Sequence, residues 1–356
     1  MHRRSFLRGL AASAVAAPLT GRSIPSFAPD RQAGMLVMDA MGELRHEYDD
    51  ALLADMLGSG LNSITVTLCN PTFEGAEALA TAVDGLLEYD RLIAARPDRL
   101  LKATSVADLE RARREGKLAV FYLYQNTTQF GTDLDRVDLF YRLGLRSAQL
   151  TYNDRNAAGA GCRAQGRLTE FGRTLIDRMN SRRMLLDLSH VNMETMADAI
   201  AASRAPAIIS HTACMAVREH VRNTTDANLR ALAERGGVVG ICQIRSFITG
   251  KKTDNLDDYM IHLEHAVNIA GAEHVCIGSD RDHRVIVLTR EYIAELAREL
   301  GPQFSEADLP MFLEALNGPR RMEVVRAAME RRGWKPADIE KVMGTNLHRL
   351  YRDVIG

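Results

Sequence analysis

Eight short apolar runs recur along the chain, and they constrain its fold more than any other feature. They lie at 36–41, 63–69, 118–125, 147–152, 183–190, 207–212, 238–243 and 274–280. Each run is continuous and does not alternate with polar residues, which is typical of strands buried on both faces of a parallel sheet.

Amphipathic stretches of helical period separate the runs, for example 134–144, 168–182 and 224–237. Thr169 can serve as an N-cap at the start of the second stretch. We expect two helices in the longer gap between 69 and 118, and further helices at the C-terminal end, outside the sheet. Eight strand–helix units are the count of a TIM (β/α)8 barrel, so we predict an α/β barrel with extra C-terminal helices. An open doubly wound sheet is the alternative, but we find no G-x-G-x-x-G turn after an early strand.

The N-terminus resembles a twin-arginine export signal. Arg3 and Arg4 precede a short apolar stretch at 9–17, which ends in small residues that a signal peptidase accepts. We therefore expect residues 1–30 to be a leader and linker, with the twin-arginine export machinery as a partner and a periplasmic or secreted location. Residues 31–356 then form one barrel domain. An amphipathic N-terminal helix is the alternative.

Charge and cysteine content exclude several classes of protein. The 45 basic and 46 acidic residues leave a net charge of -1, which gives no global basic field for nucleic acid. The five cysteines are scattered singly, so a disulfide framework or a zinc ribbon is not expected.

The last residue or two of each run mark where the predicted strands end, the edge at which barrel enzymes carry their chemistry. In chain order they are Met41 with Glu43 just beyond, Cys69, Gln125, Tyr152, His190, His211, Gln243 and Asp280. Two imidazoles and a carboxylate suit zinc or a similar divalent ion, so His190, His211 and Asp280 are candidate metal ligands. Asp280 could instead be the base that orients an attacking water. The alternative is that these are hydrogen-bonded structural residues.

Three further residues fall in the regions between the runs. Arg222 lies in the segment after the strand at 207–212, where a guanidinium could hold a substrate carboxylate through two parallel N–H bonds. A solvated loop arginine is the alternative. His262 and His265 are one helical turn apart, and we expect them on an outer helix face and not at a metal.

Several of these segments together resemble the membrane dipeptidase family, also called peptidase family M19. The informative stretches are LLDLSHVNMETM at 185–196, APAIISHTAC at 205–214, the segment 218–241 and HVCIGSDRD at 274–282. The resemblance covers residues 36 to 352. It implies a TIM barrel with a pair of zinc ions at its mouth that activate a hydroxide for attack on a dipeptide amide. It also implies a homodimer as one possible assembly.

The resemblance assigns roles to some residues and marks departures at others. His190 and His211 match the two histidine ligands of one zinc, Asp280 matches an aspartate ligand of the other, and Arg222 matches the arginine that holds the substrate carboxylate. The family's His-x-Asp metal pair is replaced by Met41-Gly42-Glu43, and its bridging glutamate by Gln125. A histidine that holds the tetrahedral intermediate is replaced by Tyr152.

These departures remove anionic ligands from the expected site. A bridging ligand needs two anionic oxygens, which an amide such as Gln125 lacks, and the Met41 thioether is a poor ligand for zinc. Glu43 could still reach a metal, and Tyr152 could donate a hydrogen bond or shuttle a proton. We therefore expect one divalent metal, zinc before others, with a pocket free of metal as the alternative.

The predicted function is an exported metallohydrolase with an altered site. It would act on a small peptide, amide or related compound with a carboxylate, using Asp280 and Tyr152 in catalysis and Arg222, Tyr152 and Gln125 in binding. A non-hydrolytic lyase or isomerase, or an inactive relative that binds a ligand, are the alternatives.

Overall fold

The computed structural model describes residues 34–300 and 304–356, which form the barrel that the sequence predicts. The leader prediction for residues 1–30 lies outside the described part of the chain. Nine strands are found in the described residues: β1 Val37–Asp39, β2 Leu61–Thr67, β3 Leu100–Lys102, β4 Leu118–Tyr124, β5 Leu145–Gln149, β6 Leu185–Asp187, β7 Ile208–Thr212, β8 Val238–Ile241 and β9 Val275–Ile277.

Eight of these strands follow one another in the order β1-β2-β4-β5-β6-β7-β8-β9, and each neighbouring pair is parallel. The amide of Ala40, just after β1, donates to the carbonyl of Ile277 in β9 at 2.9 Å, which brings the two ends of the sheet together. The barrel prediction is therefore confirmed. The short β3, which pairs with the start of β4, was not predicted, because three residues carry too little pattern.

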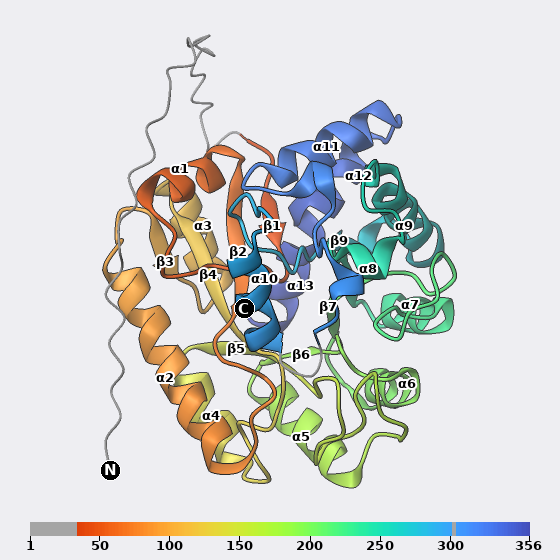
Figure 1. Ribbon diagram of the computed structural model, residues 1–356. Helices are drawn as coiled ribbons and strands as arrows, with labels where there is room; N and C mark the ends of the chain where they lie inside the picture. The colour runs from red at the N-terminus through yellow and green to blue at the C-terminus, as the bar shows by residue number, and fades with distance from the viewer. Residues whose placement is uncertain (1–33, 301–303) are drawn as a thin grey trace, which may run out of the picture.

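Helices surround the sheet and join successive strands (Figure 1). Their bounds are α1 Asp50–Gly58, α2 Gly75–Ala94, α3 Val106–Arg114, α4 Asp135–Arg142, α5 Glu170–Ser181, α6 Met193–Ala202, α7 Asp226–Glu234, α8 Arg245–Ile248 and α9 Leu256–Ala270. The two helices expected between 69 and 118 are α2 and α3. Thr169 caps α5 as predicted, because its side chain accepts from the amide of Gly172.

The predicted C-terminal helices are α10 Arg290–Leu300, α11 Arg321–Arg331, α12 Pro336–Glu340 and α13 Asn346–Val354. The Tyr351 ring of α13 packs edge-on against Phe121 of β4 with centroids 4.8 Å apart. Its hydroxyl lies 2.5 Å from Thr65 Oγ1 of β2, so α13 closes the barrel at the end away from the mouth. Among residues 34–300 and 304–356, no helix combines the length and the apolar character that a membrane span requires.

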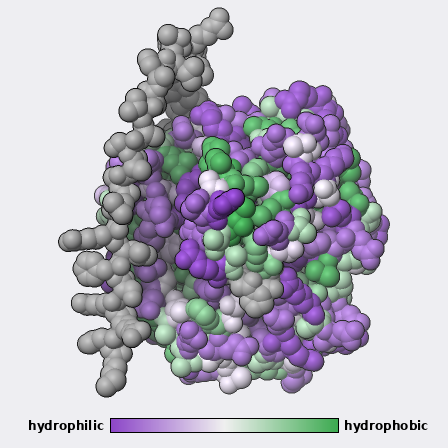
Figure 2. Space-filling view, viewed as in Figure 1, coloured by the Kyte–Doolittle hydropathy of each residue, from purple (hydrophilic) through white to green (hydrophobic). Residues whose placement is uncertain are grey.

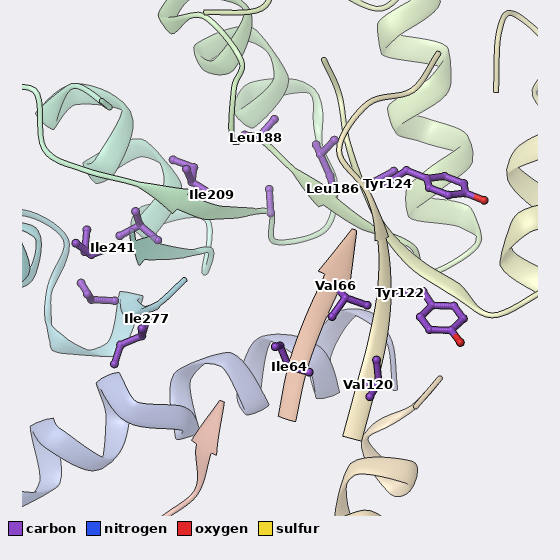
Figure 3. Close-up of a cluster of buried hydrophobic side chains, with 14 of the residues drawn as sticks. Ile64, Val66, Val120, Tyr122, Tyr124, Leu186, Leu188, Ile209, Ile241 and Ile277 are labelled. Atoms are coloured by element: carbon purple, nitrogen blue, oxygen red, sulfur yellow. The ribbon is translucent and has the colours of Figure 1, made fainter. Parts of the chain in front are cut away.

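Alternate residues of each strand face the helices or the barrel axis. Figure 3 shows the buried apolar side chains of one such set, from β2, β4, β6, β7, β8 and β9. They form the larger of two apolar cores, and complete burial of one such side chain contributes about 1.5–3 kcal/mol. The inward positions include small or polar residues such as Ser63, Ser147 and Gln149. The packing of apolar side chains between the strands and the helices therefore holds the strand ends in place at the mouth of the barrel.

Candidate active site and metal centre

The structure brings His190 and His211 into direct contact. His190 follows β6 and His211 belongs to β7, and their Nε2 atoms are 2.9 Å apart. Both side chains are buried, with 7% and 0% of their surface exposed. Burial first, and then the nearby Arg222 guanidinium, hold the pKa of each imidazole well below its usual value, so both rings are neutral at pH 7.

Hydrogen bonds on the far side of each ring fix which nitrogen carries the proton. Ser210 Oγ donates to Asp187 Oδ2 at 2.6 Å, and so it accepts from His211 Nδ1 at 2.8 Å. Asn153 Oδ1, which can only accept, lies 2.6 Å from His190 Nδ1. Both Nδ1 atoms therefore bear hydrogen, and both Nε2 lone pairs point at the same place.

Two converging lone pairs repel each other unless a cation lies between or beside them. Imidazoles held by an outer hydrogen bond at one nitrogen, with the other nitrogen open, are the usual arrangement of histidine metal ligands. The donor set at this point fits a divalent ion such as zinc, for which neutral imidazole is a preferred ligand.

Asp280 lies beyond β9, and its amide donates to the carbonyl of Met41 at 2.8 Å. Burial raises the pKa of its carboxyl group to about 7; Arg222 opposes the shift and Glu43 adds to it. The side chain is half-buried, because it borders open cavities. Asp280 and His190 both have left-handed backbone angles, with φ of 52° and 64°, which Asp and His tolerate better than most residues. Such conformations are concentrated at functional sites.

Tyr152 stacks on the His190 ring, with centroids 4.2 Å apart and planes inclined by 24°. Burial raises the pKa of its phenol to about 12, so it is a hydrogen-bond donor at neutral pH. The stacking both orients the imidazole and places the phenol beside the metal candidate site.

Two of the positions that the resemblance marks as departures contact one another. Gln125 Nε2 lies 3.6 Å from Met41 Sδ, and both side chains are buried. Glu43 points to Arg45, with Oε2 2.5 Å from Nε. Its carboxylate is therefore already engaged in an ion pair.

Arg222 lies beside the histidine pair and is 7% exposed. One of its Nη atoms is 3.4 Å from the carbonyl of His211, and its guanidinium sits over the Phe247 ring at 5.2 Å from the centroid. Its Nε has no hydrogen-bond partner among the described residues. This buried cation therefore retains donors for a ligand, as expected of an arginine that holds a carboxylate.

Two cavities meet at the barrel mouth. The large cavity is about 450 Å³ and includes Met41, Cys69 and Tyr89 in its wall. The small cavity is about 250 Å³ and includes His190, Arg222 and Tyr292 of α10. The residues common to both walls are Glu43, Arg45, Gln125, Tyr152 and Asp280. Of the predicted substrate and catalytic residues, Gln125, Tyr152 and Asp280 thus lie at the junction, and Arg222 lies in the small cavity.

The structure does not bring the three predicted ligands together as one cluster. Within residues 34–300 and 304–356, no three His, Cys, Asp or Glu side chains are close enough to hold a metal. His190 and His211 form the preorganised pair, while Asp280 stands at the junction of the cavities. The three-ligand set stays a prediction, and the remaining coordination positions would fall to water, substrate or a shifted carboxylate.

Sequence reasoning missed the residues that support the site. Asp187 accepts from the Ser210 hydroxyl, and Asp39 accepts from the Ser279 hydroxyl at 2.5 Å in the same way. A signal was present, since a serine directly precedes each candidate ligand in Ser189-His190, Ser210-His211 and Ser279-Asp280.

The expectation for His262 is wrong. This side chain is fully buried: its Nδ1 accepts from the Cys214 amide at 3.0 Å, and its Nε2 lies 3.1 Å from the Ile248 carbonyl. His265, in contrast, is half-buried and lies 2.8 Å from Asp226 Oδ1. The helix α9 packs against the barrel at His262, so helical spacing alone misassigned its face.

Comparison with known proteins decides the family. The model of the membrane dipeptidase family (Peptidase family M19) matches residues 38–297. The chain belongs to this family.

Relatives of this M19 protein include a dipeptidase, tcpJ, of Claviceps purpurea, which is 29% identical over 270 residues, or 74% of this chain and 57% of the relative. An uncharacterized dipeptidase, C965.12, of Schizosaccharomyces pombe is 34% identical over 206 residues, or 55% of this chain and 50% of the relative. The chain thus spans about half the length of the curated relatives it matches.

Solved structures share the fold over almost the whole M19 chain. An amidohydrolase from Pseudomonas aeruginosa superposes with a TM-score of 0.82 at 26% identity, covering 92% of this chain and 98% of that one. A metallopeptidase from Rhodobacter sphaeroides, liganded with a phosphinate mimic of L-Ala-D-Ala, gives a TM-score of 0.77 at 20% identity, covering 90% and 99%.

Proposed function

We propose that this M19 protein is a metal-dependent hydrolase of small peptides or amides that carry a carboxylate, and that it binds one divalent ion, zinc before others. The observation that carries the proposal is the convergence of the His190 and His211 Nε2 lone pairs 2.9 Å apart. Family membership adds dipeptide hydrolysis as the reaction to test first.

The proposal of one metal rests on the chemistry of Met41 and Gln125. A second zinc would need anionic ligands on the β1 and β4 side of the mouth, where a thioether and an amide stand and contact each other. The Glu43 carboxylate is already paired with Arg45.

Each remaining residue has a step that its surroundings suit. Arg222 holds the substrate carboxylate and so fixes the amide at the junction of the cavities. Asp280 accepts a proton from the attacking water, since its pKa of about 7 lets it exchange protons near neutral pH. Tyr152 donates to the oxygen that gains charge, and Gln125 hydrogen-bonds the substrate. The metal, when bound, polarises the amide carbonyl and lowers the pKa of water.

Export is part of the proposal and rests on residues 1–30. A twin-arginine leader would send the folded, metal-loaded protein to the periplasm or outside the cell. A homodimer is the assembly that the family resemblance suggests.

Metal analysis with an activity panel tests the proposal. The purified protein should hold about one equivalent of zinc, and cleavage of L,L- and L,D-dipeptides should stop with a chelator and return with zinc. A protein that takes up no metal, or one that cleaves no dipeptide when loaded, would refute the proposed function.

A further inference from the structure

Arg281 is a second buried arginine of the small cavity, and it directly follows Asp280. Only 6% of its surface is exposed, close to the 7% of Arg222, and both residues line this cavity. The Arg281 carbonyl is occupied, because it accepts from the Glu43 amide and from Arg321 Nη1. Its guanidinium, in contrast, makes no ion pair or hydrogen bond with the part of the chain that the structure describes.

Two of the acidic groups nearby, Asp282 and Glu43, are paired with other arginines. Asp282 accepts from Arg284 Nε and Nη2 at 2.9 and 2.6 Å, and from the Tyr48 hydroxyl at 2.7 Å. Glu43 is paired with Arg45. Asp280 and Asp308 also line the cavity, and neither forms an ion pair with a described residue. Because burial of a charge is unfavourable unless the charge is paired, two unpaired guanidiniums in one cavity point to a ligand that pairs both.

The Arg281 charge acts on two other residues of the cavity wall, and also on the buried Arg321, whose pKa it lowers. It lowers the pKa of Asp280 and of Tyr292, although burial raises both overall, and both of these residues line the same space. Arg163, which is exposed at the rim of this cavity, adds a further positive charge.

The two cavities differ in their balance of charge. The wall of the large cavity includes Glu43, Glu47, Glu88 and Asp280 against Arg45 and His46. The wall of the small cavity balances its acidic residues with arginines, and Arg222 and Arg281 form no ion pair with a described residue. The acidic residues are Glu43, Asp280, Asp282 and Asp308, and the arginines are Arg45, Arg163, Arg222 and Arg281. A dipeptide across the junction would therefore direct its amino group to the large cavity and its carboxylate end to the small one.

We infer that the small cavity binds a carboxy-terminal residue that itself carries two carboxylates, with Arg222 on the main-chain carboxylate and Arg281 on an acidic side chain. This inference rests on the proposed hydrolysis and names its substrate class, a dipeptide ending in aspartate or glutamate. Arg281 is thus a specificity-determining residue.

The test compares Ala-Glu with Ala-Gln, two dipeptides of nearly equal shape that differ by one charge. The zinc-loaded protein should cleave Ala-Glu with a kcat/KM at least about tenfold higher, as a charge-assisted pair in a desolvated site provides. In Arg281→Gln this ratio should fall toward one. Arg284→Gln is the matched control, since Arg284 is already paired with Asp282 and lies outside the cavity wall, and it should keep the wild-type ratio.

Equal cleavage of both peptides by the wild type would overturn the inference and leave the proposed function standing. If neither peptide is cleaved, the proposed function fails, and a ligand-binding measurement then tests the dicarboxylate site by itself. Glutarate should then raise the melting temperature of the metal-free wild type more than its monoamide, glutaramate, does, and Arg281→Gln should abolish the difference. Equal shifts for the two compounds in the wild type would reject the dicarboxylate site.

Discussion

The Nε2 of Gln125 lies 3.6 Å from the Sδ of Met41, across the mouth of the barrel from the histidine pair. The resemblance to the family assigns metal ligands to these two positions, so both departures fall at one place and contact one another. The contact is a weak hydrogen bond to a soft, neutral acceptor, which offers a divalent ion no negative charge.

Restoring charge at this contact should restore a second metal. In Met41→His combined with Gln125→Glu, zinc content should rise from about one toward two equivalents, because an imidazole and a carboxylate replace two poor ligands. Inductively coupled plasma measurement on dialysed protein checks this, with Gln125→Met as the control that should stay at one. Two equivalents in the wild type would refute the one-metal proposal.

Ser210 should control metal affinity without touching the metal. It links Asp187 to His211 Nδ1, so Ser210→Ala should let the imidazole reorient and weaken zinc binding about 10–100-fold. Competition with a zinc chelator measures the change. Ser147→Ala removes a buried barrel hydroxyl that bonds only the Leu185 carbonyl, and it should leave the affinity unchanged. An unaltered affinity in Ser210→Ala would show that this hydrogen-bond chain does not position the ligand.

Loss of the Arg222 charge should weaken recognition of the substrate carboxylate. We expect Arg222→Gln to lower kcat/KM for a dipeptide by about 10–100-fold, the loss of about 1.5–3 kcal/mol from charge-assisted hydrogen bonds. The same variant should discriminate little between a dipeptide and its carboxy-terminal amide. Arg218→Gln is the control, because Arg218 is not part of the wall of this cavity and its Nε donates to the Ser246 carbonyl. A wild type that cleaves peptide and amide equally well would exclude this role.

Tyr152→Phe should separate chemistry from metal binding. The ring can still stack on His190, so zinc content should be retained, while kcat should fall about a hundredfold if the hydroxyl donates to the reacting oxygen. Steady-state kinetics beside metal analysis checks both parts. Unchanged turnover would remove Tyr152 from the mechanism.

His262 should make stability depend on pH. Burial lowers the pKa of its imidazole from 6.5 to about 4, so below pH 6.5 the unfolded chain takes up a proton that the folded protein does not accept. The free energy of unfolding should therefore fall as pH drops from 6.5 toward 4, by up to about 3 kcal/mol from this group at about 1.4 kcal/mol per pH unit.

The variant His262→Gln isolates this effect from other titrating groups. It should be less stable than the wild type at pH 8, because two buried hydrogen bonds are perturbed, but the difference should shrink as the pH falls. Urea unfolding of the metal-free proteins between pH 4 and 8 measures this, with the exposed His46→Gln as control. A constant difference across that range would contradict the assignment.

Most strands and helices of the barrel could be predicted from the local pattern of apolar residues. A strand such as β4 is apolar throughout because one face packs on helices and the other on the barrel interior, and this apolar pattern is a local property of the sequence. The three-residue strand β3 was not predicted, because it is too short to show a hydrophobic period. His262 was placed on the wrong face because its helix packs on the barrel at a position that spacing does not reveal.

The sequence by itself determined the order of strands and helices, and it set a metal-ligating residue type at the ends of two of them, at His190 and His211. Only the tertiary structure decided that the two Nε2 atoms converge, since Asn153, and Asp187 through Ser210, fix their orientation from other segments of the chain. The same holds for Arg281, whose partnerless charge in a cavity depends on Asp282 and Glu43 being engaged elsewhere. The sequence specifies the type of each residue. The pairing of charges and the burial of side chains depend on contacts between residues that are distant in the chain, and only folding forms these contacts.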